Sequence, residues 1–150
     1  MQVRTKLFRL LASSAFFAAA TAPIVAHHSF AAEFDASKPV TIKGTVVKVE
    51  WVNPHSWIYI DVKNPEGKVD TWAVEGGAPN SLLRRGWTKN SVPVGVEIVV
   101  EGFQAKDSSL RANGRDITFP DGKRLFIGSE GTGAPEEKPG DKPGRGRGGK

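Results

Sequence analysis

The chain has 150 residues, the length of one domain, and 39% of them are hydrophobic. Its formal charge of +5 arises mostly at the N-terminus, because residues 1–26 contain three basic and no acidic side chains, whereas residues 27–128 contain 13 basic and 12 acidic ones. This near-neutral centre argues against a nucleic-acid partner, and the absence of cysteine excludes disulfides, thiolate metal sites and cysteine nucleophiles.

The first 26 residues have the order of a secretory signal peptide. A short basic stretch precedes an apolar run over residues 10–20, and a segment ending in Ala26 follows. The apolar run is shorter than a helix that spans a bilayer, so the membrane is a partner only during export. Cleavage after Ala26 would make His27 the first residue of a periplasmic or secreted protein, although cleavage after Ala20 or Ala22 also fits the spacing of small residues.

Three β-rich stretches follow an entry segment. Residues 30–39 show no strand or helix periodicity, and we expect Phe30 and Phe34 to pack on the domain. The turn-forming residues at 64–67 indicate that the second and third stretches form a hairpin. The predicted strands cover residues 40–51 with a bend at Gly44, residues 56–63 with clean alternation, and residues 68–75.

A change of period after the third strand predicts one short helix. Asn80 or Ser81 can cap its start, and Gly86 can end it. Beyond the helix, we expect strands over residues 95–106, 115–120 and 123–127, with a polar loop over 107–114. Residues 129–150 consist mainly of glycine, proline and charged residues, so they predict a disordered tail.

This order of elements predicts a mostly β fold, namely a small five-stranded OB-like antiparallel barrel with one short helix between the third and fourth strands. The domain organisation is a signal peptide over 1–26, the OB-like domain over 27–128 and the tail over 129–150. Residues expected to have a structural role are Val46, Trp51, Ile60, Val62, Trp87, Ile98 and Val100.

Two motifs, HHSF and EW-x-NPH, stand at the start of the domain and at the end of its first predicted strand. Together with the blocks WAVEGG, LLRRGW and DGKRLFIG, they make the chain resemble an uncharacterised family of small exported bacterial proteins with an OB-like fold. The resemblance covers about residues 27–128. It implies a fold and a location, and it implies no particular activity.

The chain has three histidines, and they suggest a metal site. If export leaves His27 at the N-terminus, the free amine and the imidazoles of His27 and His28 can chelate an ion, with His55 as a further ligand. Such nitrogen donors suit Cu(II) best and Zn(II) or Ni(II) next. Glu33, Asp35 or Glu50 could complete the shell. The alternative is that the three histidines are solvated or cap a turn, and bind no metal.

An aromatic face is the second candidate site. With a four-residue loop over 64–67, Tyr59 would pair with Trp72, and both would share one face of the hairpin with Trp57. Sugar rings or bases could stack on these aromatics. Equally, the three rings could be buried, and a shift of one residue in register would reverse the assignment.

Catalysis is the least favoured class of function. The sequence lacks the G-x-S-x-G, H-E-x-x-H and P-loop motifs, and His55 and Ser56 would point to opposite faces of a strand. We therefore expect a binding module and not an enzyme. If no metal binds, its partner would be a protein or a small-molecule ligand of the cell envelope.

Overall fold

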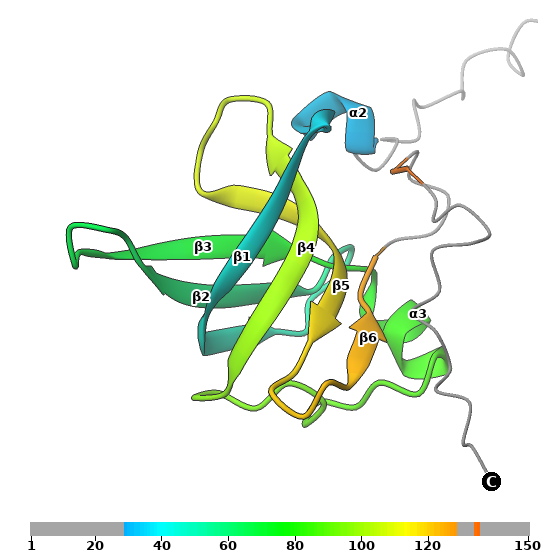
Figure 1. Ribbon diagram of the computed structural model, residues 1–150. Coiled ribbons are helices and arrows are strands. Elements are labelled where there is room, and N and C mark those ends of the chain that lie inside the picture. Colours follow the sequence, from blue (N-terminus) through cyan, green and yellow to red (C-terminus); the bar gives the residue numbers. More distant parts are fainter. Residues whose placement is uncertain (1–28, 129–133, 136–150) are drawn as a thin grey trace, which may run out of the picture.

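The computed structural model describes residues 29–128 and 134–135. The predicted signal peptide, His27, His28 and most of the predicted tail lie outside these described residues. Neither helix of the described part has the length and apolarity that crossing a membrane requires. Along the chain the elements are α2 (Phe30–Glu33), β1 (Phe34–Glu50), β2 (Trp57–Lys63), β3 (Val69–Glu75), α3 (Pro79–Arg84), β4 (Glu97–Ala105), β5 (Arg111–Thr118) and β6 (Arg124–Phe126) (Figure 1).

Five of the strands form a closed ring. Strand β1 pairs with β2 and with β4, β2 pairs with β3, and β4 pairs with β5, all antiparallel. A parallel pairing of β3 with β5 closes the ring, and the short β6 extends the sheet from β5. The expected mostly β, OB-like fold is confirmed, including one short helix between β3 and β4. The closing parallel pair is the one departure from an all-antiparallel ring.

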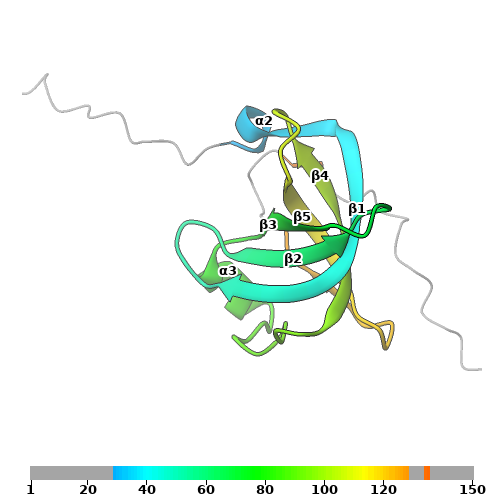
Figure 2. The same cartoon turned by 90° about the vertical axis from the view of Figure 1, so that its left-hand side faces the viewer.

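Strand β1 serves both halves of the ring. Its first part pairs with β4 and its last part with β2, and Thr45 is the residue at which the two pairings meet. Figure 2 shows β1 as a strongly curved band around the molecule. The neighbouring Gly44 lies so close to β2 that a Cβ atom there would meet the backbone carbonyl of Asp61 and the side chain of Ile60. The predicted bend therefore marks a close approach of two strands, and the β-bulge lies slightly further on, between Val46 and Lys48.

The core fills the interior of the ring. Val46, Ile60, Ile98, Val100 and Trp87 are buried in it. Trp51 and Val62 pack against it while partly exposed, so all seven residues predicted to be structural contribute to this core.

A second, smaller apolar cluster fastens α2 to the end of the ring. Phe30 and Phe34 are buried with Phe103 and Ala105 of β4, and the rings of Phe30 and Phe103 meet edge to face with centroids 5.5 Å apart. Ala134 packs against the same cluster. The prediction that Phe30 and Phe34 pack on the domain is confirmed. The absence of structure expected over 30–39 is wrong, because Phe34 already begins β1 and pairs with Ala105.

Helix α3 is tied to the end of β6. It begins with Pro79, whose ring pre-sets the backbone angle of a first helical residue, and Ala78 before it offers no side-chain cap, so the expected caps at Asn80 or Ser81 are wrong. Gly86 follows the helix with a φ of 87°, as expected for a glycine that ends one. Two side chains after α3 then reach the end of β6 and the residues that follow it. Trp87 Nε1 donates to the carbonyl of Phe126, and Arg85 donates to that of Gly128.

The hairpin of β2 and β3 has a different register from the predicted one. Asn64 N donates to the carbonyl of Lys68, so the loop has three residues, and Gly67 in it has a φ of 80°. A turn followed by a left-handed glycine is the usual form of such a loop. Consequently Trp72 pairs with Ile60, and the predicted pair of Tyr59 and Trp72 is wrong by one residue.

The polar loop expected over 107–114 is also shorter in the structure. Strand β5 begins at Arg111, and Ala112 and Asn113 are buried. They are strand residues because they pair with Val74 and Glu75 of β3, a contact between distant parts of the sequence.

Candidate functional site

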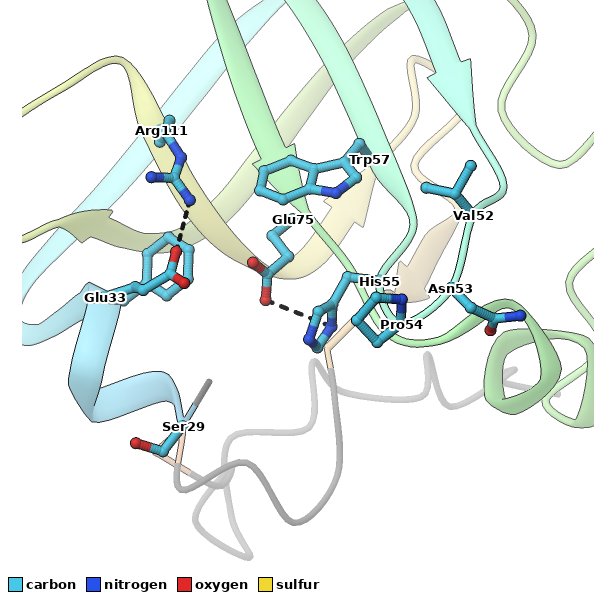
Figure 3. A pocket seen from close by; sticks show the side chains of 10 residues that line it. Ser29, Glu33, Val52, Asn53, Pro54, His55, Trp57, Glu75 and Arg111 are labelled. Carbon is cyan, nitrogen blue, oxygen red and sulfur yellow. Dashed lines mark hydrogen bonds and ion pairs between the residues drawn. The ribbon is translucent and has the colours of Figure 1, made fainter. Parts of the chain in front are cut away.

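A pocket of about 460 Å³ opens between α2, the loop joining β1 to β2, and the start of β5. In OB folds, the region around this loop and the faces of the second and third strands commonly binds ligands. Figure 3 shows the side chains around the pocket. Its lining consists of Ser29, Glu33, Phe34, Val52, Asn53, Pro54, His55, Trp57, Glu75 and Arg111.

A histidine and a glutamate meet in the wall of this pocket. His55 Nδ1 lies 3.5 Å from Glu75 Oε1, and only 17% and 10% of the two side chains are exposed. His55 Nδ1 has no hydrogen-bond partner among the described residues, whereas Glu75 accepts a long bond from Asn113 Nδ2. A buried nitrogen without a hydrogen-bond partner costs stability.

Burial raises the pKa of Glu75 above the ordinary glutamate value. The nearby His55 and Arg111 act in the opposite direction, and the carboxylate of Glu33 adds to the increase. A cation that enters the pocket would favour the charged form of Glu75, because it would replace the missing solvation.

On the opposite wall of the pocket, Arg111 contacts both α2 and two aromatic side chains. Its Nη2 atom lies 2.6 Å from Oε2 of Glu33 on α2. The guanidinium carbon is also 5.9 Å from the ring centroid of Phe34 and 5.7 Å from that of Trp57, so the cation faces two aromatic rings. The pocket thus contains two carboxyl groups, one permanent cation, one imidazole and an aromatic wall.

The structure brings together some of the predicted site residues and separates others. His55 and Trp57 line the same pocket, and Glu33 joins them, whereas His27 and His28 lie outside the described residues. Within residues 29–128 and 134–135, no group of three or more acidic or histidine side chains is arranged to hold a metal ion. A complete metal site would therefore need ligands beyond those described.

The predicted aromatic face is only partly formed. Trp72 shares the core-facing side of the hairpin with Ile60 and packs against the core, so it does not lie beside Trp57 and Tyr59. Lys48 Nζ lies 5.1 Å from the centre of the Tyr59 ring, and Arg111 covers Trp57 in a similar way. The two outward-facing rings thus already have cations against them.

The two other carboxylates considered as ligands lie elsewhere. Asp35 accepts hydrogen bonds from Ser37 and is not in the pocket lining. Glu50 accepts a bond from the hydroxyl of Tyr59 and forms an ion pair with Lys48.

Two residues of the site, Glu75 and Arg111, were not predicted from the sequence. Glu75 ends β3 directly opposite Trp57, so the correct hairpin register would have placed it beside the predicted site. Arg111 reaches the pocket through the parallel pairing of β3 with β5, which has no local signal in the sequence.

Comparisons with known proteins bear on the family. The family described as "Family of unknown function (DUF6152)" matches residues 15–114. No curated protein matches the chain. Among solved structures, the mitochondrial single-stranded DNA-binding protein Rim1 of S. cerevisiae is similar with a TM-score of 0.41 and 16% identity, over 61% of this chain and 97% of that one. This similarity is too slight to bear on what the chain binds.

Proposed function

The chain belongs to the family of unknown function DUF6152, and we propose that it is an exported OB-like binding module whose pocket holds a divalent transition metal, Cu(II) in preference to Zn(II) or Ni(II). Cleavage after Ala26 would release it to the periplasm or the medium with His27 first. One observation carries the proposal: Ser29, the residue after His28, lines the same pocket as His55 and Glu75.

Chain connectivity supports a meeting of the three histidines. Successive Cα atoms are about 3.8 Å apart, so His28 and His27 are one and two such steps from a residue in the pocket lining. Processing would add a free amine to the two imidazoles, while His55 and Glu75 would contribute one nitrogen and one carboxylate from the opposite wall. Nitrogen donors of this kind favour Cu(II). Affinity should fall in acid, because each ligand must be deprotonated to bind.

The proposal is tested by titrating the processed protein with Cu(II). A bacterial host secretes the chain, mass spectrometry identifies its first residue, and calorimetry follows binding. We expect one ion per chain with a Kd below about 1 µM. The matched control carries one additional glycine before His27, which moves the amine and should weaken binding. His55→Ala should weaken it as well.

Two results would count against the proposal. Wild-type protein with His27 first that binds Cu(II) no more tightly than about 1 µM would leave a metal-free module as the better interpretation. Unchanged affinity after the glycine addition would show that the amine of His27 is not a ligand of Cu(II).

The size of the pocket favours a second candidate, a metal-free module for a small organic ligand. A volume of about 460 Å³ falls within the range of small-molecule sites, and Val52, Pro54 and Trp57 supply apolar surface. Ligand-observed NMR on protein kept in a chelator distinguishes the two candidates. The second candidate would be supported by ligands that bind the wild type but not Trp57→Ala. The Cu(II) titration should then show no binding.

A further inference from the structure

We infer that a second pocket, at the end of the ring away from α2, binds a small aliphatic carboxylate such as a medium-chain fatty acid. This pocket has a volume of about 370 Å³ and lies between the end of β1 and the loop that joins α3 to β4 (Figure 1). Its lining consists of Val49, Trp51, Lys89, Asn90, Val92, Pro93 and Val94. It shares no residue with the pocket that contains His55, so the inference goes beyond the proposed function and requires no metal.

The end of β1 supplies one apolar wall of the second pocket. Val49 and Trp51 are two residues apart, and both pack against the core of the ring. Lys48 and Glu50 alternate with them along the chain and form an ion pair with each other, so the Glu50 carboxylate is not part of the lining. Val92, which is buried in the core, carries the apolar surface across to the loop.

Hydrogen bonds hold the loop that forms the other wall. Thr88 N donates to the hydroxyl of Ser91, and Asn90 N donates to the hydroxyl of Thr88. Further along the loop, Gly95 N donates to the carbonyl of Val46 in β1. The second pocket is therefore formed without a ligand, and binding would not have to include the cost of ordering this loop.

Exposed aliphatic surface indicates the kind of ligand body that the second pocket suits. Val94 is 65% exposed, the largest value among the exposed large hydrophobic side chains of the described residues. The neighbouring Pro93 is exposed too. An aliphatic chain that lies against these two residues and against Trp51 would remove apolar surface from water on both partners, which is favourable.

The charge of the second pocket indicates the head group. Lys89 and Asn90 are its two polar lining residues, and none of the lining residues is acidic. In the described part of the chain, the ammonium group of Lys89 has no ion pair or hydrogen bond. An ammonium donates strong hydrogen bonds to a carboxylate, and it would repel a cationic ligand. A mostly apolar pocket with one charged group at its edge therefore suits an aliphatic acid.

The test uses the secreted protein in a chelator, with octanoate as the probe and 1-octanol as its uncharged counterpart. Protein-observed NMR should show one saturable octanoate site, with shift changes at the indole N–H of Trp51 and at the amides of residues 89–94. Lys89→Met keeps an apolar stem and removes the charge. It should weaken octanoate binding by about fivefold and leave the affinity for octanol unchanged.

The matched control for this variant is Lys123→Met. Lys123 is an exposed lysine in the turn between β5 and β6, and it does not line the second pocket. This control should bind octanoate as the wild type does. Equal weakening in both lysine variants would show that net charge, and not the position of Lys89, controls affinity, and it would overturn the inference.

Val94→Asp tests the apolar wall without relying on Lys89. Because Val94 is exposed, the variant should fold, and the new carboxylate should weaken octanoate binding by at least about tenfold. Val69→Asp is the control, because Val69 is 47% exposed and lies outside the second pocket. Wild-type affinity in Val94→Asp, or a wild type without a saturable octanoate site, would overturn the inference. Neither result bears on the Cu(II) titration, since the two pockets have no lining residue in common.

Discussion

His55 Nδ1 lies 3.5 Å from Glu75 Oε1 in the pocket wall, although the two residues come from the loop before β2 and from the end of β3. This separation is too long for a good hydrogen bond, and both side chains are largely buried. The pair therefore combines a carboxyl group that is poorly solvated with an imidazole nitrogen that lacks a partner. Such an arrangement costs the unliganded protein stability.

This cost predicts a pH dependence for Glu75→Gln. Burial raises the pKa of Glu75 above its ordinary value of 4.5, so the folded state holds the proton more tightly than the unfolded state. The stability contributed by the neutral carboxyl is complete below about pH 4.5 and is lost as pH rises through the raised pKa. Glutamine stays neutral, so the Tm of the variant minus that of the wild type should increase between about pH 4 and pH 7.

The measurement is thermal denaturation of both proteins in a chelator. Glu66→Gln, in the exposed turn of the hairpin, is the matched control for a change from glutamate to glutamine. Parallel curves for Glu75→Gln and the wild type would contradict the prediction.

Trp57 should report on an ion in the pocket. It is the one tryptophan of the four in the chain that lines this pocket, and Trp72 packs against the core instead. Bound Cu(II) should quench part of the tryptophan fluorescence, and Trp57→Phe should lose most of that quenching. Trp72→Phe is the matched control and should keep it. Equal loss in both variants would show that the ion does not bind near Trp57.

Gly44→Ala should destabilise the fold. A Cβ atom at this position would meet the backbone carbonyl of Asp61, which cannot move without disturbing β2. We expect a loss of about 1–3 kcal/mol in the free energy of unfolding, measured with urea. Thr45→Ala, at the exposed next position, should cost less than about 1 kcal/mol. Similar values for the two variants would show that the close approach is not tight.

Phe30→Ala should loosen α2 while leaving the main core folded. Truncating a buried phenylalanine costs about 3–5 kcal/mol, and Phe30 belongs to the smaller cluster and not to the core of the ring. Hydrogen exchange should become fast at α2 and at the amide of Lys106, with core strands protected as before. Phe126→Ala, at a partly exposed ring, should not change exchange at α2. Loss of protection throughout the core would contradict this separation.

Local patterns predicted most of the fold. The alternation of residues 57–62 placed Ile58 and Ile60 in the core, and both are buried. Glycines and prolines predicted the turns. The hairpin register was predicted wrongly because it depends on whether Asn64 and Lys68 close the loop. A change of one residue in loop length moves Trp72 to the other face of the hairpin.

The candidate site was less predictable, since it is assembled from distant segments. His55 and Trp57 are close in sequence and were both selected. Arg111 was not, because nothing near it in the sequence shows that β5 pairs with β3. Glu33 was considered as a metal ligand because of its charge. Its contact with Arg111 was not predicted, because the short helix α2 leaves no periodicity in the sequence.

The parallel pairing of β3 with β5 has a consequence for how the protein would respond to a ligand. Ala73 and Arg111 are paired there, and Arg111 also lines the pocket, so Arg111 belongs both to the pocket wall and to the pairing that closes the ring. A ligand bound in the pocket would oppose the transient separation of these two strands. Occupancy should thus be visible as slowed deuterium uptake at the amide of Ala73, which donates to the carbonyl of Leu110.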